Sequence, residues 1–453
     1  MKRIFTKATG IAMVLFMVFT MAACGGSGTA PESTTAAATV TESSQAAETT
    51  AAPADEPVTL RIYAQYSDDD TKTPYDYAIA AMKKDMPNVT LDLDIVAQDD
   101  NAKLKTYAAT GNLPDIFQSA GDIISTLKAS NNILMLDDQA PTADFKSRIQ
   151  PSAMNILMSS DGHIWAYPYA GNEMVLLYYN KELFSQAGVE VPKTVDELIA
   201  AVKVFNSKGI VPLSIFAKEK WPGVALFDYL AMRQEPMGIR KLDANQGKAS
   251  DEAFAWAAQK FAEFAKAGLF QKGATNTNYD QAESLFLTGK AAMFLNGQWE
   301  IASASEKMGD KCDWMFFPGK DEANYEQAKY NFSGGGGPGG YSVSANSKNQ
   351  EAAVKVAAYL SLKYAECKYT TRGTPIVATK VDAPMVTPFP PMMEKLAQVI
   401  PDIKSFGSFD WNLTNTKFKV AIEDATQRLV TGSYSAEDFV KDMDKAIENA
   451  NED

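Results

Sequence analysis

The chain has 453 residues and carries 43 Lys and Arg against 56 Asp and Glu, which gives a formal net charge of -13. An acidic chain without a local basic patch repels phosphate backbones, so we expect no nucleic-acid partner. The single histidine, His163, cannot supply a multi-histidine metal site and three cysteines are too few for a disulfide framework, so we expect no metal, no cofactor and stability from apolar cores.

The first 23 residues predict a secretory signal. A basic start that includes Lys2 and Arg3 precedes an uncharged, largely apolar stretch over 8–23, which is shorter than the roughly 20 residues that span a membrane. Small residues stand directly before Cys24, in a pattern that resembles a bacterial lipobox. We therefore expect residues 1–23 to be a lipoprotein signal peptide and Cys24 to receive the lipid. The alternative is an ordinary signal followed by a chance cysteine.

Residues 24–57 predict a disordered tether. After Cys24 the segment is rich in Ala, Thr and Ser, and it contains no aromatic residue, Lys or Arg. Such a composition cannot bury enough apolar surface to offset the loss of backbone entropy. As a flexible coil its reach is about 30 Å, so a lipid on Cys24 would hold the folded body close to a membrane.

The remaining chain alternates strand and helix patterns. Residues 58–63 and 89–95 alternate apolar and polar positions, as half-buried strands do. Between them, residues 77–86 predict a helix that stops at Pro87. Thr194 and Glu197 form the pattern of a helix capping box, and several amphipathic helices follow. Strand, helix and strand at this spacing predict an α/β fold with parallel pairing.

Three blocks then carry a resemblance to a known family. Residues 161–198 include DGHIWAYPY, LLYYNKELF and PKTVDEL; residues 286–299 read FLTGKAAMFLNGQW; and residues 111–116 read GNLPDI. Together and in this order, they resemble blocks of the family 1 bacterial extracellular solute-binding proteins. The resemblance extends over the whole body of the chain.

This resemblance implies a type II periplasmic-binding-protein-like fold, in which two discontinuous α/β lobes are joined by a three-segment hinge. Pro168, Pro318 and Pro375 punctuate the three crossings that we place by similarity. The expected lobes are 58–170 plus 318–371, and 171–317 plus 372–453.

The same resemblance implies a function. The protein is expected to be a monomer that captures a carbohydrate, most simply an oligosaccharide, by hinge closure and delivers it to the permease subunits of an ABC importer. It would be exported and lipid-anchored on the outer face of the cytoplasmic membrane, on the surface of a Gram-positive cell. No bond is broken, so no enzyme activity is expected. Two alternatives stay open: a lipid-anchored glycosidase that uses two carboxylates, and a binding protein that serves a sensor.

Sugars present apolar C–H faces and a rim of hydroxyl groups, which aromatic rings and polar side chains complement. Trp299 is the first candidate contact, because it follows the glycine turn of the family block; a core tryptophan is the alternative. Asn296 and Gly297 belong to the same turn by similarity. The glycine run 334–340 lacks the Gly-Lys-Ser/Thr ending of a phosphate loop. We expect this run, with Gly336, to allow close approach of the backbone to the solute or to move with closure, and a merely flexible loop is the alternative.

The other candidates follow strands, flank the crossings or lie in loops, and helix capping or packing is the alternative for several of them. They are Tyr66, Asp68, Gln118, Ser119, Asp122, Tyr169, Asn172, Glu173, Trp221, Arg372, Asp410 and Trp411. The sequence leaves open whether Cys312 and Cys367 pair.

Overall fold

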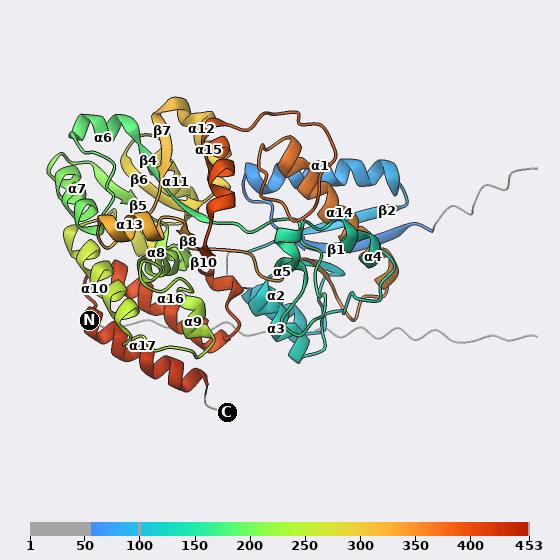
Figure 1. Cartoon of the computed structure of the whole chain (residues 1–453). Helices are drawn as coiled ribbons and strands as arrows, with labels where there is room; N and C mark the ends of the chain where they lie inside the picture. Colours follow the sequence, from blue (N-terminus) through green and yellow to red (C-terminus); the bar gives the residue numbers. More distant parts are fainter. Residues whose placement is uncertain (1–55, 98–100, 452–453) are drawn as a thin grey trace, which may run out of the picture. The chain divides into compact units, whose positions relative to one another are not determined.

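A computed structural model describes residues 56–97 and 101–451 (Figure 1). The signal peptide, Cys24 and nearly all of the tether lie outside the described residues. Within the described ranges, no helix combines the length and the hydrophobicity that a membrane crossing requires.

The first sheet has the strand order β2-β1-β3-β9. β1 pairs in parallel with both β2 and β3, and β9 runs antiparallel to β3. The strands are β1 (Val58–Ala64), β2 (Val89–Ile95), β3 (Ile116–Ser119) and β9 (Gly340–Val343). The structure thus confirms the parallel strand–helix–strand unit that the sequence predicted.

The helices associated with this sheet include two long ones, α1 and α14, that pack against each other. α1 begins eight residues earlier than predicted, because Asp68 and Thr71 form a capping box and the helix accommodates Pro74. The helices are α1 (Asp69–Asp85), α2 (Ala102–Ala109), α3 (Gly121–Ala129), α4 (Thr142–Arg148), α5 (Met154–Leu157) and α14 (Gln350–Thr370).

The second sheet has the strand order β5-β6-β4-β7. β6 runs antiparallel to β4 and parallel to β5, and its seven residues are all buried. The strands are β4 (Val175–Asn180), β5 (Val211–Ser214), β6 (Ala291–Gly297) and β7 (Cys312–Met315).

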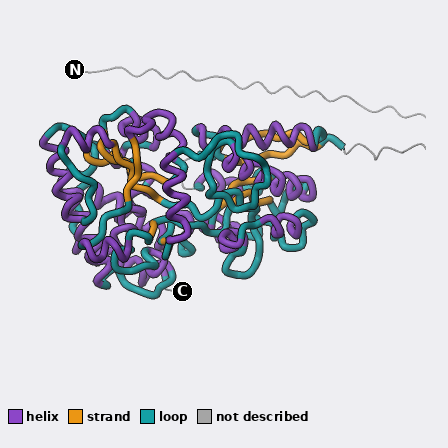
Figure 2. Tube along the Cα trace, turned by 45° about the horizontal axis from the view of Figure 1, so that its top comes forward, coloured by secondary structure: helices purple, strands orange, loops and turns teal. Residues whose placement is uncertain are grey.

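Helices surround the second sheet (Figure 2). The predicted capping box of Thr194 and Glu197 opens α7, and Ser435 caps the last helix. The helices of this part are α6 (Lys181–Ala187), α7 (Val195–Ser207), α8 (Trp221–Ala231), α9 (Ile239–Asp243), α10 (Glu252–Ala267), α11 (Tyr279–Leu287), α12 (Glu300–Met308), α13 (Glu322–Ala328), α15 (Pro391–Val399), α16 (Thr416–Val430) and α17 (Ala436–Ala450).

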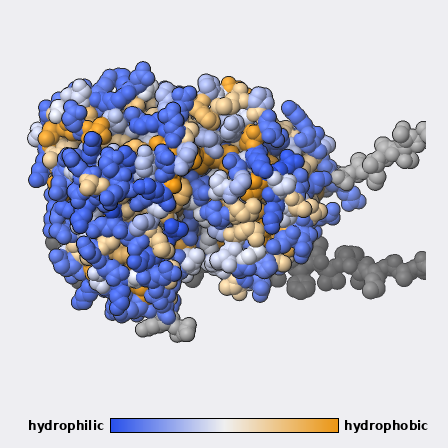
Figure 3. All heavy atoms as spheres, viewed as in Figure 1, coloured by the Kyte–Doolittle hydropathy of each residue, from blue (hydrophilic) through white to orange (hydrophobic). Residues whose placement is uncertain are grey.

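Each sheet has its own buried apolar core. Leu60, Ile62 and Val343 belong to the core of the first sheet, whereas Leu177 and Phe294 belong to that of the second. We refer below to the first-sheet part and the second-sheet part. The face drawn in Figure 3 is largely hydrophilic, with apolar residues scattered over it.

The second passage of the chain between the two parts lies later than the predicted boundary at 318. Phe332 still packs in the second core, and its short strand β8 (Asn331–Phe332) pairs with β10 (Ser405–Phe406). Buried Arg233 holds this segment by donating to the carbonyl oxygens of Phe317 and Asn331. The chain joins the first sheet only at Gly340, after the glycine run.

Candidate functional site

Three tryptophans from distant parts of the chain meet in the second-sheet part. Trp221 opens α8, Trp299 stands directly before α12, and Trp411 lies in the short 3-10 helix Asp410–Asn412. The ring centroid of Trp221 lies 5.9 Å from that of Trp299 and 5.6 Å from that of Trp411. Phe409 completes the group, with its ring stacked on Trp411 at 4.2 Å. These four residues are the tryptophan cluster.

The cluster has a buried base and partly accessible rings. Phe409 is only 2% exposed, while all three tryptophans are partly exposed. Phe216, which is fully buried, packs edge-on against Trp221 at 5.1 Å. Rigid aromatic rings of this kind offer broad apolar faces at little cost in conformational entropy. The cluster therefore presents partly exposed apolar ring faces over a buried aromatic base.

The position of the Trp299 ring requires a glycine at residue 297. A Cβ atom at Gly297 would overlap the six-membered ring of Trp299, which folds back over the glycine. Any side chain at this position would have to displace the ring. Gly297 thus acts through Trp299, which explains why the two residues occur together in one turn.

Asn296 is fully buried and its polar atoms have partners within the protein. Its amide nitrogen donates to the Tyr279 hydroxyl at 3.0 Å and to Glu300 at 3.1 Å, and its oxygen accepts from the backbone of Gly297 at 2.8 Å. Burial, and next the charge of Glu283, raise the pKa of Glu300 well above its ordinary value. Asn296 therefore lies beneath the turn and supports it from inside.

The glycine run is fixed by contacts on both sides. The amide of Gly336 donates to the Asn172 side chain at 2.9 Å, and the carbonyl of Gly335 accepts from Asn412 at 3.2 Å. At Gly334 and Gly335 the backbone has φ of 106° and 111°, which glycine adopts without strain. A Cβ atom at Gly336 would overlap Ile156. These contacts fix the glycine run in place. The side-chain oxygen of Asn172 already accepts a hydrogen bond from Gly336.

Glu173 and Arg372, near the first and third passages of the chain between the two parts, lie beside the ion pair of Lys368 with Asp70. Lys368 contacts Asp70 at 2.6 Å, and Arg372 lies 3.8 Å from the same carboxylate. Burial raises the pKa of Glu173 to about 7, against the lowering effect of Lys368 and with a further raising effect of Asp70. Gln298, one residue before Trp299, donates to Glu173 at 3.2 Å. This bond links the passage to the tryptophan turn.

Arg372 keeps two buried nitrogens, Nε and one Nη, without a hydrogen-bond partner among the described residues. Tyr169 packs against the rings of Tyr341 at 5.4 Å and Tyr364 at 4.4 Å. Its ring therefore serves packing within the first-sheet part.

The candidates near the first sheet are partly exposed. Gln118 accepts from the backbone of Gln65 at 2.7 Å, and its amide nitrogen has no partner among the described residues. Ser119 shares a hydrogen bond of 2.6 Å with Ser342. Asp68 caps α1, which is the alternative role that the sequence left open, and the Tyr66 hydroxyl donates to Asp76.

Asp122 and Asp410 are almost fully buried, at 1% and 4% exposure. Asp122 forms an ion pair with Lys419 at 2.9 Å, and Lys419 lies 3.6 Å from Glu423. Lys419 and Glu423 were not predicted from the sequence. Their only sequence signal is a pair of charges four residues apart on an amphipathic helix, which is common on solvated surfaces.

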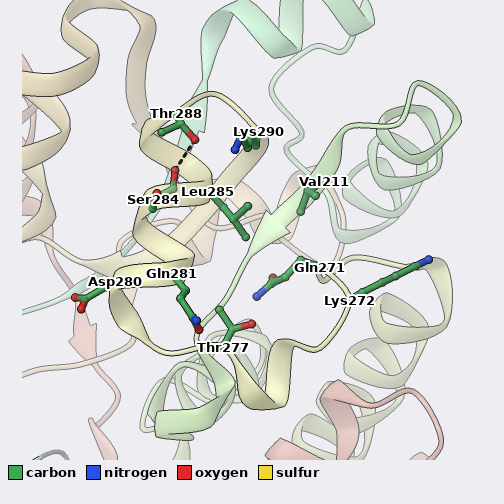
Figure 4. Close-up of a pocket in the computed structure, with 10 residues that line it drawn as sticks. All are labelled: Val211, Gln271, Lys272, Thr277, Asp280, Gln281, Ser284, Leu285, Thr288 and Lys290. Atoms are coloured by element: carbon green, nitrogen blue, oxygen red, sulfur yellow. Dashed lines mark hydrogen bonds between the residues drawn. The ribbon is translucent and has the colours of Figure 1, made fainter.

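A surface pocket lies elsewhere in the second-sheet part, between β5 and α11 (Figure 4). Val211, Gln271, Gln281 and Leu285 are among the residues that line it. It contains none of the predicted site residues. In the described ranges, no group of three or more His, Cys, Asp or Glu side chains could hold a metal ion. Cys312 and Cys367 are both buried and unpaired.

A family model described as "Bacterial extracellular solute-binding protein" matches residues 68–363, more than half of the chain. Among curated proteins, the chain is 24% identical over 248 residues to an uncharacterised ABC transporter extracellular-binding protein of Pyrococcus horikoshii, covering 53% of this chain and 55% of that protein. It is 26% identical over 390 residues to the galactooligosaccharide-binding protein of Bacillus subtilis, covering 82% and 85%. The chain spans about half the length of the first curated relatives it matches.

Solved structures agree with the fold. One comes from work on xylan utilisation by the thermophilic bacterium Caldanaerobius polysaccharolyticus and is 27% identical in sequence to this chain. The superposition has a TM-score of 0.76 and includes 86% of this chain and 99% of that one. The type II periplasmic-binding-protein fold expected from the sequence is therefore confirmed.

Proposed function

This chain belongs to the bacterial extracellular solute-binding protein family, and from that premise we propose that it captures an oligosaccharide outside the cell for uptake by an ABC importer. The tryptophan cluster is the observation that carries the proposal, because partly exposed indole rings match the C–H faces of sugar rings. Relatives whose names state galactooligosaccharides or maltotriose as ligands support the same class of solute.

In this proposal, the solute binds by closure of two lobes. The lobes predicted from the sequence, corrected at the second passage, are 58–170 with 340–371, and 171–333 with 372–453. Within the last range, residues 377–380 lie against the first-sheet part, because Val377 and Thr379 bridge to Ala170 and Ile149 and Ala378 belongs to the first core. A solute drives closure only if it contacts both lobes in the closed form. Trp221, Trp299 and Trp411 would supply the contacts of one lobe, and Gln118, Ser119 and Asp68, at the ends of β3 and β1, those of the other.

The finer features belong to the same proposal. Cys24 would carry a lipid, residues 24–57 would tether the monomeric body to the outer face of the cytoplasmic membrane, and permease subunits would receive the loaded form. The protein would release the solute unchanged, without enzyme activity.

Incubation of the purified protein with a panel of oligosaccharides tests the proposal. We expect saturable binding of one solute per protein by calorimetry, with the solute recovered intact by chromatography. Release of shorter sugars would contradict the transport function and favour a glycosidase. Absence of binding to every carbohydrate in the panel would remove the proposed class of solute.

A further inference from the structure

Four buried ionisable side chains lie together next to the tryptophan cluster. Asp122, Lys419, Glu423 and Asp410 are 1%, 3%, 5% and 4% exposed. Lys419 Nζ lies 2.9 Å from Asp122 Oδ2 and 3.6 Å from Glu423 Oε1. Asn101 adds a long hydrogen bond of 3.4 Å to Asp122. We call the four ionisable residues the buried charge cluster.

The buried charge cluster joins the two parts of the molecule. Asp122 lies in the first turn of α3, directly after β3 of the first sheet, and Ile123 beside it belongs to an apolar cluster with Tyr63 and Phe117. Lys419 lies on α16, which packs against α8, α10 and α17 in the second-sheet part. The ion pair therefore crosses from one part to the other. The same contact brings Gly121 against the backbone of Asn412.

Separating the side chains of Asp122 and Lys419 costs free energy. One carboxylate oxygen of Asp122 has no hydrogen-bond partner among the described residues, and the other is contacted by the Lys419 ammonium group and by the Asn101 amide. A buried charge that loses its partner is strongly destabilising. In this arrangement the segment after β3 is consequently held against α16.

The cluster also reaches the tryptophans. Asp410 accepts from the backbone of Trp411 at 2.9 Å, and Trp411 stacks on Phe409. Burial, and next the charge of Glu423, raise the pKa of Asp410 well above its ordinary value. Lys419 therefore lies between two carboxyl groups, that of Asp122 from the first-sheet part and that of Glu423 on its own helix.

We propose that Asp122 and Lys419 are positioning residues, whose ion pair stabilises the closed arrangement of the two parts and thereby strengthens ligand binding without contact to the ligand. This inference rests on the proposed function, because it concerns the closure of the same site. It also assigns Asp122 and Asp410, expected from the sequence as ligand contacts, to a buried network behind the tryptophan cluster.

A double-mutant cycle on ligand affinity tests the proposal. The variants are Asp122→Asn, Lys419→Gln and the double variant, and the probe is the oligosaccharide that the wild type binds best in the panel. We expect each single variant to weaken binding on the order of tenfold and the double variant to be no weaker than the worse single one, because both substitutions break one interaction. Asp313→Asn, which alters the 2.9 Å ion pair of Asp313 with Lys395 within the second-sheet part, is the matched control and leaves affinity unchanged.

Small-angle X-ray scattering of the same proteins provides a readout that direct contact with the ligand would not change. Without ligand, the two single variants should have a larger mean radius of gyration than the wild type, whereas Asp313→Asn should not. Circular dichroism verifies that each variant is folded; Asp122→Asn, which preserves shape, keeps the test valid if Lys419→Gln does not fold.

Additive losses of affinity together with unchanged scattering would overturn the proposal and make Asp122 a ligand contact. Unchanged affinity and scattering in both single variants would overturn it as well. If the wild type binds no carbohydrate, the proposed function fails, and the scattering of the ligand-free variants still decides whether the ion pair joins the two parts.

Discussion

The indole ring of Trp299 lies over Gly297, so closely that a single added methyl group would overlap it. Gly297 ends β6, whose residues are all buried, and Trp299 follows two residues later. The buried strand thus fixes the place of the turn, and the absence of a side chain at Gly297 sets the orientation of the ring. The contact explains how one short block of sequence defines one wall of the proposed binding site.

Gly297→Ala is therefore expected to weaken ligand binding by at least about fivefold, because the displaced ring of Trp299 loses part of its contact with the solute. Calorimetric titration measures the change. Gly111→Ala is the control: Gly111 has φ of 68° and an added Cβ there meets open space, so the substitution costs stability through backbone strain but leaves affinity unchanged. Equal affinities of Gly297→Ala and the wild type would refute the role of this contact.

Trp299→Ala should reduce affinity by on the order of 1 to 3 kcal/mol, the scale of the apolar burial that the ring provides. Because the ring is partly exposed in the ligand-free molecule, the protein should remain folded. The control is Trp165→Ala, since Trp165 lies in the first-sheet part and bonds to Asp161. If both variants bound the ligand as the wild type does, the tryptophan cluster would not be the site.

The raised pKa of Glu173 predicts that the stability of the protein depends on pH. Its pKa is about 7 in the folded protein and 4.5 in a model peptide, so the folded state binds the proton more tightly and stability falls as pH rises from about 4.5 to 7. Glu173→Gln removes this proton uptake. Between pH 4.5 and 8, we expect the free energy of unfolding of the variant to rise by on the order of 1 to 2 kcal/mol relative to that of the wild type. This is less than the full linkage value, because Glu173 keeps some solvent exposure.

Urea denaturation at a series of pH values measures this difference. Glu190→Gln, at an exposed position, is the control and should track the wild type. A constant difference in unfolding free energy between Glu173→Gln and the wild type over this pH range would show that Glu173 ionises in its ordinary range.

Cys24→Ser is expected to release the protein from membranes, because an acidic body does not bind anionic lipid headgroups by itself and a single lipidated residue would supply the attachment. Detergent phase partitioning of the expressed protein measures the anchoring. Cys312→Ser, at a buried and unpaired cysteine, is the control and should partition as the wild type does. Retention of Cys24→Ser in the detergent phase would argue against lipidation.

The parts of the fold that follow local rules could be predicted from the sequence. Alternation at residues 58–63 and 89–95 identified two paired strands, and the Thr194–Glu197 capping box identified the start of α7. The predicted start of α1 at Tyr77 was wrong, because the capping box of Asp68 and Thr71 begins the helix at Asp69. The predicted boundary at 318 was too early, because buried Arg233 holds the segment that follows it to the second core.

The site was predictable to a smaller extent. The family resemblance and residue type named three tryptophans, which the fold does bring together, but Phe409 and Lys419 were missed because an apolar residue and a helical charge carry no distinctive local signal. Asn296 lies at the end of β6, and Asp122 and Asp410 follow strand ends, as contact residues often do, yet burial separates their side chains from solvent. Burial of this kind depends on helices that are distant in sequence.

The central claim, that an oligosaccharide binds on the tryptophan cluster, is tested most directly by a crystal structure of the protein with the best ligand from the panel. We expect a sugar ring stacked within about 4 Å of at least one of Trp221, Trp299 and Trp411, the range of van der Waals contact. A ligand bound elsewhere, for example in the pocket beside Val211 and Gln271, with all three indole rings free of sugar, would contradict the account.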